Sequence, residues 1–368
     1  MKRINLSLPT SFNRCTPAQL RAIAAVIADC GTRSSLSRYT PYDPYESKVG
    51  VFFVLTGIEV IEPVNPRVPV EKQYFVCRLR PYSLEDENKW HGIYRKYRRS
   101  LAWIKRNIFR QDNDFKLYLY QIHYWLTSHK NNINGKEISG LLDWLDADSG
   151  DHLFNFPIPE IRRRRKWYKR RVTFQGTAPL MDGFSWQRYR FCQDFMEMYV
   201  NHSNRLLQLS QQKNVSEEDI IKTTHNIDLA RSLFLATVFN RQVKYVDSDT
   251  GRIVRDYRYV SNQHSDNSPF FRDFPAADWQ LILLWWEGQM HYLAKRYPKV
   301  FKKTPVKRNT TPTDPLSLYT RTTATIEKYL HITADEIERE PYTTIIQQME
   351  DMIRHNEELE RINRQTRK

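Results

Sequence analysis

Residues 275–297, PAADWQLILLWWEGQMHYLAKRY, decide the fold class of this chain. The stretch indicates one long helix, which only Gly288 interrupts and which ends before Pro298, because proline cannot continue a helix. Its longest apolar run, Leu281–Trp286, is far shorter than a membrane span, which needs about 20 apolar residues. The stretch therefore predicts a mainly helical protein without a membrane-spanning segment.

Helix signals recur on both sides of this stretch. Ser185 precedes an apolar periodic segment, so it is expected to be the N-cap of a helix from Trp186 to about His202. The helix predicted at Ala18–Asp29 is amphipathic, and its apolar residues on one face indicate a core helix: Leu20, Ile23, Ala24 and Ile27. Further helices are predicted at Leu84–Arg110, Asp228–Phe239, Leu316–Leu330 and Pro341–Gln365.

Strand signals are fewer. Tyr74–Leu79 predicts a strand, and Arg241–Val254 predicts a β-hairpin that turns at Asp249–Gly251. Val49–Gly57 is apolar, and its pattern leaves strand and buried helix open. Ser261–Ser268 is polar and is expected to be a loop. Together these signals predict a mainly α fold with minor β (α+β), in which a helical core carries a short hairpin and a tethered C-terminal helical unit.

Changes in composition divide the chain into five parts. Lys302–Pro315 contains three prolines and several Thr, Lys and Arg residues, which is typical of a linker. A basic segment separates two helix-rich halves. The expected division is an N-terminal α+β domain at 1–153, a basic connector at 154–178, a helical domain with a hairpin at 179–301, a Pro/Thr-rich linker at 302–315 and a C-terminal helical tail at 316–368.

The charge balance points to anionic partners. The chain has 368 residues, and 57 Lys and Arg against 42 Asp and Glu give a net charge of +15. This excess predicts attraction to polyanions such as nucleic acid, an acidic protein or anionic lipid. A basic charge that serves solubility alone is the alternative, and the sequence leaves it open.

The densest charge lies in one run that also holds two aromatic residues. So many neighbouring cations repel one another and need water, acidic groups or phosphate around them. One interpretation is a nucleic-acid site in which Trp167 and Tyr168 stack on bases; the other is an exposed connector that is only solvated or docks on an acidic protein. The basic face of Leu84–Arg110 would favour the first if it lay on the same side. The polyanion-binding candidates are Arg162, Arg163, Arg164, Arg165, Lys166, Trp167, Tyr168, Lys169, Arg170 and Arg171.

The sequence contains no recognisable catalytic motif. None of the ten histidines belongs to an HxxxH, HExxH or His-x-His pattern. We therefore expect a protein that is not an enzyme, with no metal site and no cofactor. The cysteines form no CxxC pair and are expected to be reduced thiols: Cys15, Cys30, Cys77 and Cys192.

The C-terminal helix is amphipathic, with apolar residues at spacings of three, four and seven. This pattern is typical of a helix that docks either on a partner or on its own domain. The candidate partner-contacting residues are Ile345, Ile346, Met349, Met352, Ile353, Leu359 and Ile362.

Several blocks of the chain resemble a group of phage proteins. Leu8-Pro9-Thr10-Ser11 leads to a Thr-Pro-x-x-Leu helix start at Thr16–Leu20, and Pro179–Tyr189 contains Pro-x-x-x-Gly-Phe-Ser-Trp. The order of these blocks resembles uncharacterised tailed-phage and prophage morphogenesis proteins. The C-terminal segment with Asp335-Glu336-Ile337 and Pro341-Tyr342 is similar to the tails of phage tail-assembly chaperones.

This resemblance implies a non-enzymatic role in virion or tail assembly, as a chaperone-like protein or a minor structural component that acts through protein–protein contacts. The implied partners are phage structural or tail proteins, with no membrane involved. The implied location is the cytoplasm of the bacterial host or the virion. The alternative function is that of a nucleic-acid-binding accessory protein that uses the basic run at 162–171.

Overall fold

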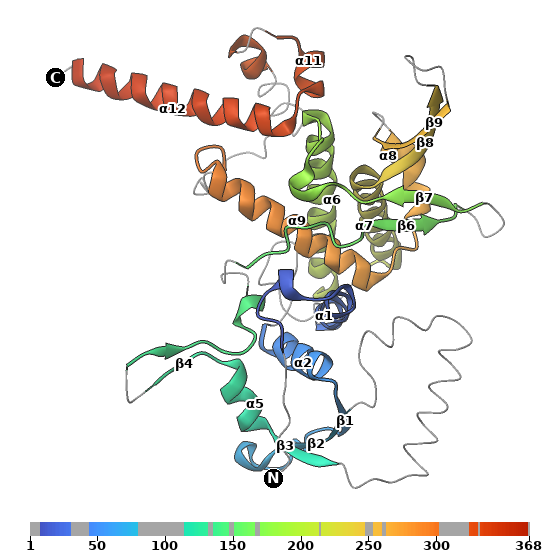
Figure 1. Cartoon of the computed structure of the whole chain (residues 1–368), viewed down its shortest axis with the longest axis vertical. Helices are drawn as coiled ribbons and strands as arrows, with labels where there is room; N and C mark the ends of the chain where they lie inside the picture. Colours follow the sequence, from blue (N-terminus) through green and yellow to red (C-terminus); the bar gives the residue numbers. More distant parts are fainter. Residues whose placement is uncertain are drawn as a thin grey trace. The chain divides into compact units, whose positions relative to one another are not determined.

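The computed structural model describes residues 8–30, 44–79, 114–131, 135–146, 151–165, 170–212, 215–246, 253–259, 263–301, 324–329 and 332–366. The chain forms two compact units (Figure 1). Met1–Leu153 and Pro275–Trp285 make up the first unit, and Phe154–Phe274 and Trp286–Lys368 make up the second. Helices predominate in the described residues, with three small antiparallel sheets, so the predicted mainly α fold with minor β is confirmed.

Two helices form the core of the first unit. The helix α1 (Pro17–Cys30) buries the four apolar residues that the sequence placed on one face, and this prediction is confirmed. The apolar stretch at 49–57, for which the sequence left strand and buried helix open, is helical up to Thr56 and belongs to α2 (Pro44–Thr56). A Cβ at Gly50 would lie 2.6 Å from Cγ1 of Val26, so a glycine at this position lets α1 and α2 approach closely.

The rest of the first unit is a small sheet with short flanking elements. The strands β1 (Ile58–Glu62), β2 (Tyr74–Leu79) and β3 (Phe115–Tyr118) pair antiparallel in the order β1-β2-β3, and β2 confirms the strand predicted there. The other elements are the 3-10 helices η1 (Phe12–Arg14), η2 (Val70–Lys72) and η3 (Asp143–Leu145), the helix α5 (Leu119–Leu126) and the strand pair β4 (His129–Lys130) and β5 (Glu137–Ile138).

A four-stranded antiparallel sheet lies in the second unit, with the order β6-β7-β8-β9. Its strands are β6 (Glu160–Arg163), β7 (Val172–Gln175), β8 (Asn240–Val246) and β9 (Ile253–Arg258). The pair β8–β9 confirms the strands of the predicted hairpin, and its predicted turn at Asp249–Gly251 lies outside the described residues. The stretch at 154–178 is not the expected connector, because its ends pair as β6 and β7 and the side chain of Phe174 in β7 is fully buried.

The helices of the second unit pack beside this sheet. The helix α6 (Trp186–Ser210) starts at the predicted N-cap, where the Ser185 side chain accepts a hydrogen bond from the Arg188 amide. The helix α7 (Glu217–Val238) runs antiparallel to α6, since Arg188 near the start of α6 reaches the last turn of α7. The shorter helices are η5 (Pro179–Met181), α8 (Gln263–Asn267) and η6 (Ser268–Phe270).

The predicted loop at Ser261–Ser268 is wrong in part, because residues 263–267 form α8. His264 of α8 is buried, and its ring lies 4.6 Å from Phe191 and 5.1 Å from Phe195. These contacts with α6 favour a helix that the polar composition did not indicate.

The predicted long helix is confirmed as α9 (Ala276–Arg296), and the boundary between the two units falls inside it. Every residue from Trp279 to Trp286 is buried, as expected for a helix segment that is apolar except at Gln280. None of the helices that the structure describes is both long and apolar enough to cross a membrane.

The C-terminal helices α11 (Ala334–Arg339) and α12 (Tyr342–Thr366) belong to the second unit, whereas the sequence predicted a tethered tail at 316–368. The hydroxyl of Tyr342 donates to the Leu180 carbonyl at 2.7 Å, and its ring stacks on Tyr189 with the centroids 4.9 Å apart. These contacts join α12 to the start of α6. The predicted linker at 302–315 lies outside the described residues, as do 316–323 of the next predicted helix.

Candidate polyanion-binding site

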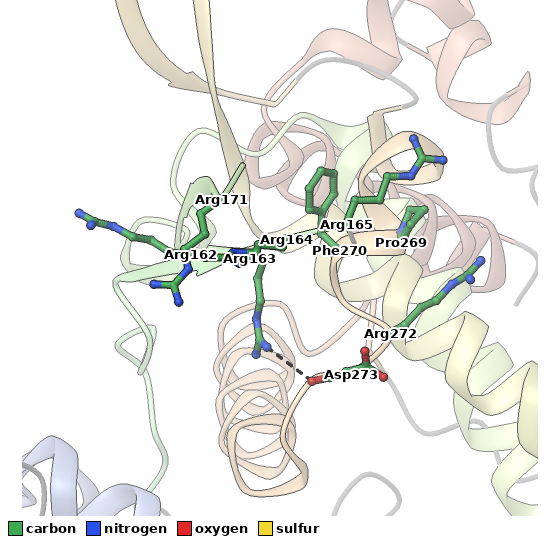
Figure 2. A pocket seen from close by; sticks show the side chains of 9 residues that line it. All are labelled: Arg162, Arg163, Arg164, Arg165, Arg171, Pro269, Phe270, Arg272 and Asp273. Atoms are coloured by element: carbon green, nitrogen blue, oxygen red, sulfur yellow. Dashed lines mark hydrogen bonds between the residues drawn. The ribbon is translucent and has the colours of Figure 1, made fainter. Parts of the chain in front are cut away.

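A groove with a volume of about 830 Å³ lies in the second unit (Figure 2). Two chain segments form it: the β6–β7 hairpin and the stretch from η6 to Asp273. Six of its nine lining residues are arginines, and one is an acid. We call it the arginine groove, and its lining residues are Arg162, Arg163, Arg164, Arg165, Arg171, Pro269, Phe270, Arg272 and Asp273.

The sheet brings these two segments together. In β6, Arg162 pairs with Thr173 and Arg163 with Val172 of β7. The strand β7 also pairs with β8, and each of these two strands contacts the ring of Phe270 in η6: Phe174 lies 5.4 Å from it and the Arg241 guanidinium 5.7 Å. The hairpin therefore lies against a segment about 100 residues later in the chain.

Arg163 is the structural member of the groove. It is half-buried, its guanidinium lies 4.9 Å from the ring of Phe274, and it donates to the Asp273 carbonyl at 3.5 Å. The Arg231 side chain donates at 3.1 Å to the neighbouring carbonyl of Arg272. Hydrogen bonds from two arginines thus hold the loop that carries Arg272.

The other groove arginines are exposed to solvent. They are Arg162, Arg164, Arg165, Arg171 and Arg272. Arg162 makes an ion pair with Glu160 at 3.3 Å, but 67% and 49% of the two side chains are exposed, so this pair is weak. Figure 2 shows Arg163 directed toward Asp273, while Arg162 and Arg165 extend in different directions. Asp273 and Glu160 together cannot neutralise six arginines, so the described part of the groove has a positive potential.

Five of the six described residues of the predicted basic run line the groove. Arg162, Arg163, Arg164, Arg165 and Arg171 line it. Arg170 is exposed beside them but does not line it. The remaining candidates lie outside the described residues: Lys166, Trp167, Tyr168 and Lys169. The predicted basic helix at Leu84–Arg110 lies outside them too.

Four lining residues of the groove were not predicted from the sequence, which are Pro269, Phe270, Arg272 and Asp273. They follow the segment that the sequence assigned to a loop, and they stand about 100 residues after the basic run. The local pattern Ser-Pro-Phe-Phe-Arg-Asp-Phe at 268–274 was a usable signal, since aromatic rings interleaved with a cation are typical of surfaces that bind nucleic acid.

The second set of candidates divides along α12. Ile345 and Ile346 are buried within the chain's own fold, and so is Glu350, whose carboxylate accepts from the amides of Lys299 at 2.8 Å and Val300 at 3.0 Å. The first half of α12 is therefore docked on its own unit. Met349, Met352 and Ile353 are partly exposed.

The second half of α12 is exposed. Every residue from Arg354 to Thr366 is on the surface, including Leu359 at 46% and Ile362 at 49% exposure. In Figure 1 this half projects from the rest of its unit toward the C-terminus. Leu359 and Ile362 are thus the candidates for partner contacts that are accessible to another protein.

Titratable groups elsewhere in the described residues form no obvious reaction centre. Burial raises the pKa of the Cys15 and Cys192 thiols to about 12, so both stay protonated and poorly nucleophilic at neutral pH. In the described parts of the chain, no group of three or more His, Cys, Asp or Glu side chains is placed to hold a metal ion.

The fold and the groove define a mainly α protein with a concentrated arginine surface. No known protein family, no curated protein and no solved structure matches the chain.

Proposed function

We propose that this protein binds nucleic acid, with the phosphate backbone lying in the arginine groove. The observation that carries the proposal is the convergence of six arginines from two distant segments on one groove, whose described lining residues include a single carboxylate. Such a surface is electrostatically unfavourable by itself and is stabilised when phosphates replace the missing anions.

Phosphate and carboxylate both suit these side chains, and the spacing of the anionic groups favours nucleic acid. A guanidinium is planar and presents paired N–H donors that match two oxygens of a phosphate. Nucleic acid supplies such groups at regular, short intervals, whereas an acidic protein surface rarely does. The net charge of +15 adds long-range attraction that would speed the encounter. The role requires no turnover, so we propose a non-enzymatic protein.

The test is the salt dependence of binding. Fluorescence anisotropy with a labelled oligonucleotide, as single strand and as duplex, is measured from about 50 to 200 mM salt, where phosphate contacts dominate the change in affinity. In the variant, Arg164, Arg165 and Arg272 are each replaced by Gln. Losing three contacts should weaken binding and lower the slope of log K against log salt by about 2 for the single strand.

A matched variant controls for net charge. Arg205→Gln, Arg361→Gln and Arg364→Gln together remove the same charge from exposed positions on α6 and α12. This control should keep the slope of the unaltered protein. Equal affinities and slopes for the two triple variants would reject the arginine groove as the binding site. Saturable binding to an acidic protein, with no binding to either oligonucleotide, would reject the function.

We also propose a second role, in tailed-phage morphogenesis, through the exposed half of α12. It rests on the resemblance of the sequence blocks to phage morphogenesis proteins and on the exposure of Leu359 and Ile362 on one projecting helix. The partner would be a phage structural or tail protein that contributes an apolar surface. The role would be chaperone-like or that of a minor structural component.

Co-expression with the tail proteins of the same gene cluster tests this second role. The protein should co-purify with one of them, and Leu359→Glu with Ile362→Glu should abolish the complex without unfolding α12. The control is Glu358→Gln with Arg361→Gln, which leaves both apolar residues in place. If the Glu variant retains the complex, α12 is not the contact.

A further inference from the structure

We infer that the arginine groove selects single-stranded nucleic acid, because Phe270 provides a stacking surface for an unpaired base. The inference rests on the proposed function, which supplies the phosphate contacts, and adds the class of nucleic acid. Among the described residues, two apolar ones line the groove, Pro269 and Phe270, and they are adjacent in η6.

The position of Phe270 is fixed by the fold. Its ring meets that of Phe174 edge to face at 5.4 Å, and the Arg241 guanidinium lies 5.7 Å from its centre. Arg241 is itself oriented by a hydrogen bond of 3.3 Å to Oδ1 of Asn267 in α8. A ring that is already held in place loses little conformational entropy when a ligand stacks on it.

The hydrophobic core does not require an aromatic side chain at position 270. The next residue, Phe271, is fully buried among Phe174, Phe239 and Phe274, and it fills the core at this point. Phe270 remains partly exposed and lines a groove of cations. Figure 2 shows the Phe270 ring among the arginines that line the groove.

The combination of cations and a ring distinguishes single strands from duplex. In a duplex the bases are paired and stacked inside, so only phosphates could enter the groove and the Phe270 ring would gain no partner. A single strand can place its phosphates on the arginines and turn a base onto the ring. Groove cations together with aromatic stacking are the general means by which proteins bind single strands without reading sequence.

Three probes separate the contribution of the phosphate contacts from that of base stacking on Phe270. They are a short oligothymidylate, an abasic strand of the same length with phosphates but no bases, and a duplex of the same length. For the unaltered protein, we expect the oligothymidylate to bind about tenfold more tightly than the abasic strand, within the range that base–aromatic stacking gives. The variant Phe270→Leu should lose this tenfold difference and leave the abasic strand and the duplex unaffected.

A ring-retaining variant excludes a packing effect. Phe270→Tyr keeps the π-face and should bind like the unaltered protein. If Phe270→Leu weakens all three probes equally, or none, or if the duplex binds as tightly as the single strand, the inference is wrong. The proposed function survives that result if removing Arg164, Arg165 and Arg272 still weakens every probe. If the arginine variant changes nothing, the proposed function itself fails.

Discussion

Arg188 is 4% exposed, and its guanidinium donates to the carbonyls of Thr237 at 2.9 Å and Val238 at 3.2 Å. It also lies 3.8 Å from the centre of the Phe184 ring. The arginines of the groove, apart from Arg163, are exposed and face a single lining carboxylate. Both regions belong to the second unit, so the same side chain occurs there in two very different environments.

The difference lies in where the hydrogen-bond acceptors are. Arg188 finds them inside the fold, at the C-terminal end of α7, whose last turn has no basic residue of its own. A cation at this end is favoured by the helix dipole and satisfies carbonyls that the helix leaves unpaired. Desolvation lowers the pKa of Arg188 to about 10, so the group is still charged at neutral pH. The groove arginines other than Arg163 are exposed, so a ligand can supply acceptors to them.

The largest expected effect is the loss of Arg188. Arg188→Met keeps much of the apolar stem but leaves the Thr237 and Val238 carbonyls buried without this donor. Since hydrogen bonds to a charged group contribute about 1.5–3 kcal/mol each, we expect the free energy of unfolding in urea to fall by about 3 kcal/mol. Arg205→Met, on the exposed face of the same helix, is the control and should change little. A loss of under about 1 kcal/mol for Arg188→Met would break the comparison.

Replacing the buried anion Glu350 should also lower the free energy of unfolding, as we expect for the buried cation Arg188. Glu350 is 1% exposed and accepts from two backbone amides, those of Lys299 and Val300. Glu350→Gln removes the charge from these bonds, and we expect a loss of about 2 kcal/mol. Hydrogen exchange at the two amides should become faster. Exposed Glu358→Gln should leave their exchange unchanged; if both variants behave alike, Glu350 does not anchor α12.

Arg163 is intermediate between the buried Arg188 and the exposed groove arginines. Its replacement should therefore lower both stability and oligonucleotide binding, each by a small amount. Arg163→Ala removes the bond to the Asp273 carbonyl and the contact with Phe274. We expect a loss of about 1 kcal/mol in stability together with weaker oligonucleotide binding. Arg163→Lys retains the charge without the planar guanidinium, so it should restore binding more fully than stability. Recovery of stability alone would show that Arg163 does not contact the ligand.

The sequence was sufficient where a pattern was local. Ser185 and the periodic stretch after it located the start of α6, and the apolar spacing at 18–29 identified the buried face of α1. It failed at β6, where Ile161 and Arg163 are the less exposed residues of the strand. A run of identical cations hides the period-two alternation of a strand, so 154–178 resembled a solvated connector.

The candidate site was only half predictable for a related reason. The basic run was visible as charge density, but Phe270 and Arg272 join it only through the pairing of β7 with β8 and the packing of η6 on both strands. The docking of α12 depends in the same way on the distant pair Tyr189 and Tyr342. No local window of sequence contains such long-range pairings.

The smallest expected effect on stability is that of replacing exposed groove arginines, which are the counterpart of the buried Arg188. Arg165 and Arg272 are exposed, and neither side chain forms an ion pair within the described residues. Arg165→Gln with Arg272→Gln should therefore leave the free energy of unfolding within about 0.5 kcal/mol of the unaltered protein. A slight gain in stability is expected at low salt, because removing two of six neighbouring cations relieves their repulsion, and this gain should vanish when salt screens the charges. A clear loss of stability would mean that these two arginines have acceptors within the fold, as Arg188 does. The groove would then be part of the architecture, and its positive charge would no longer imply a ligand.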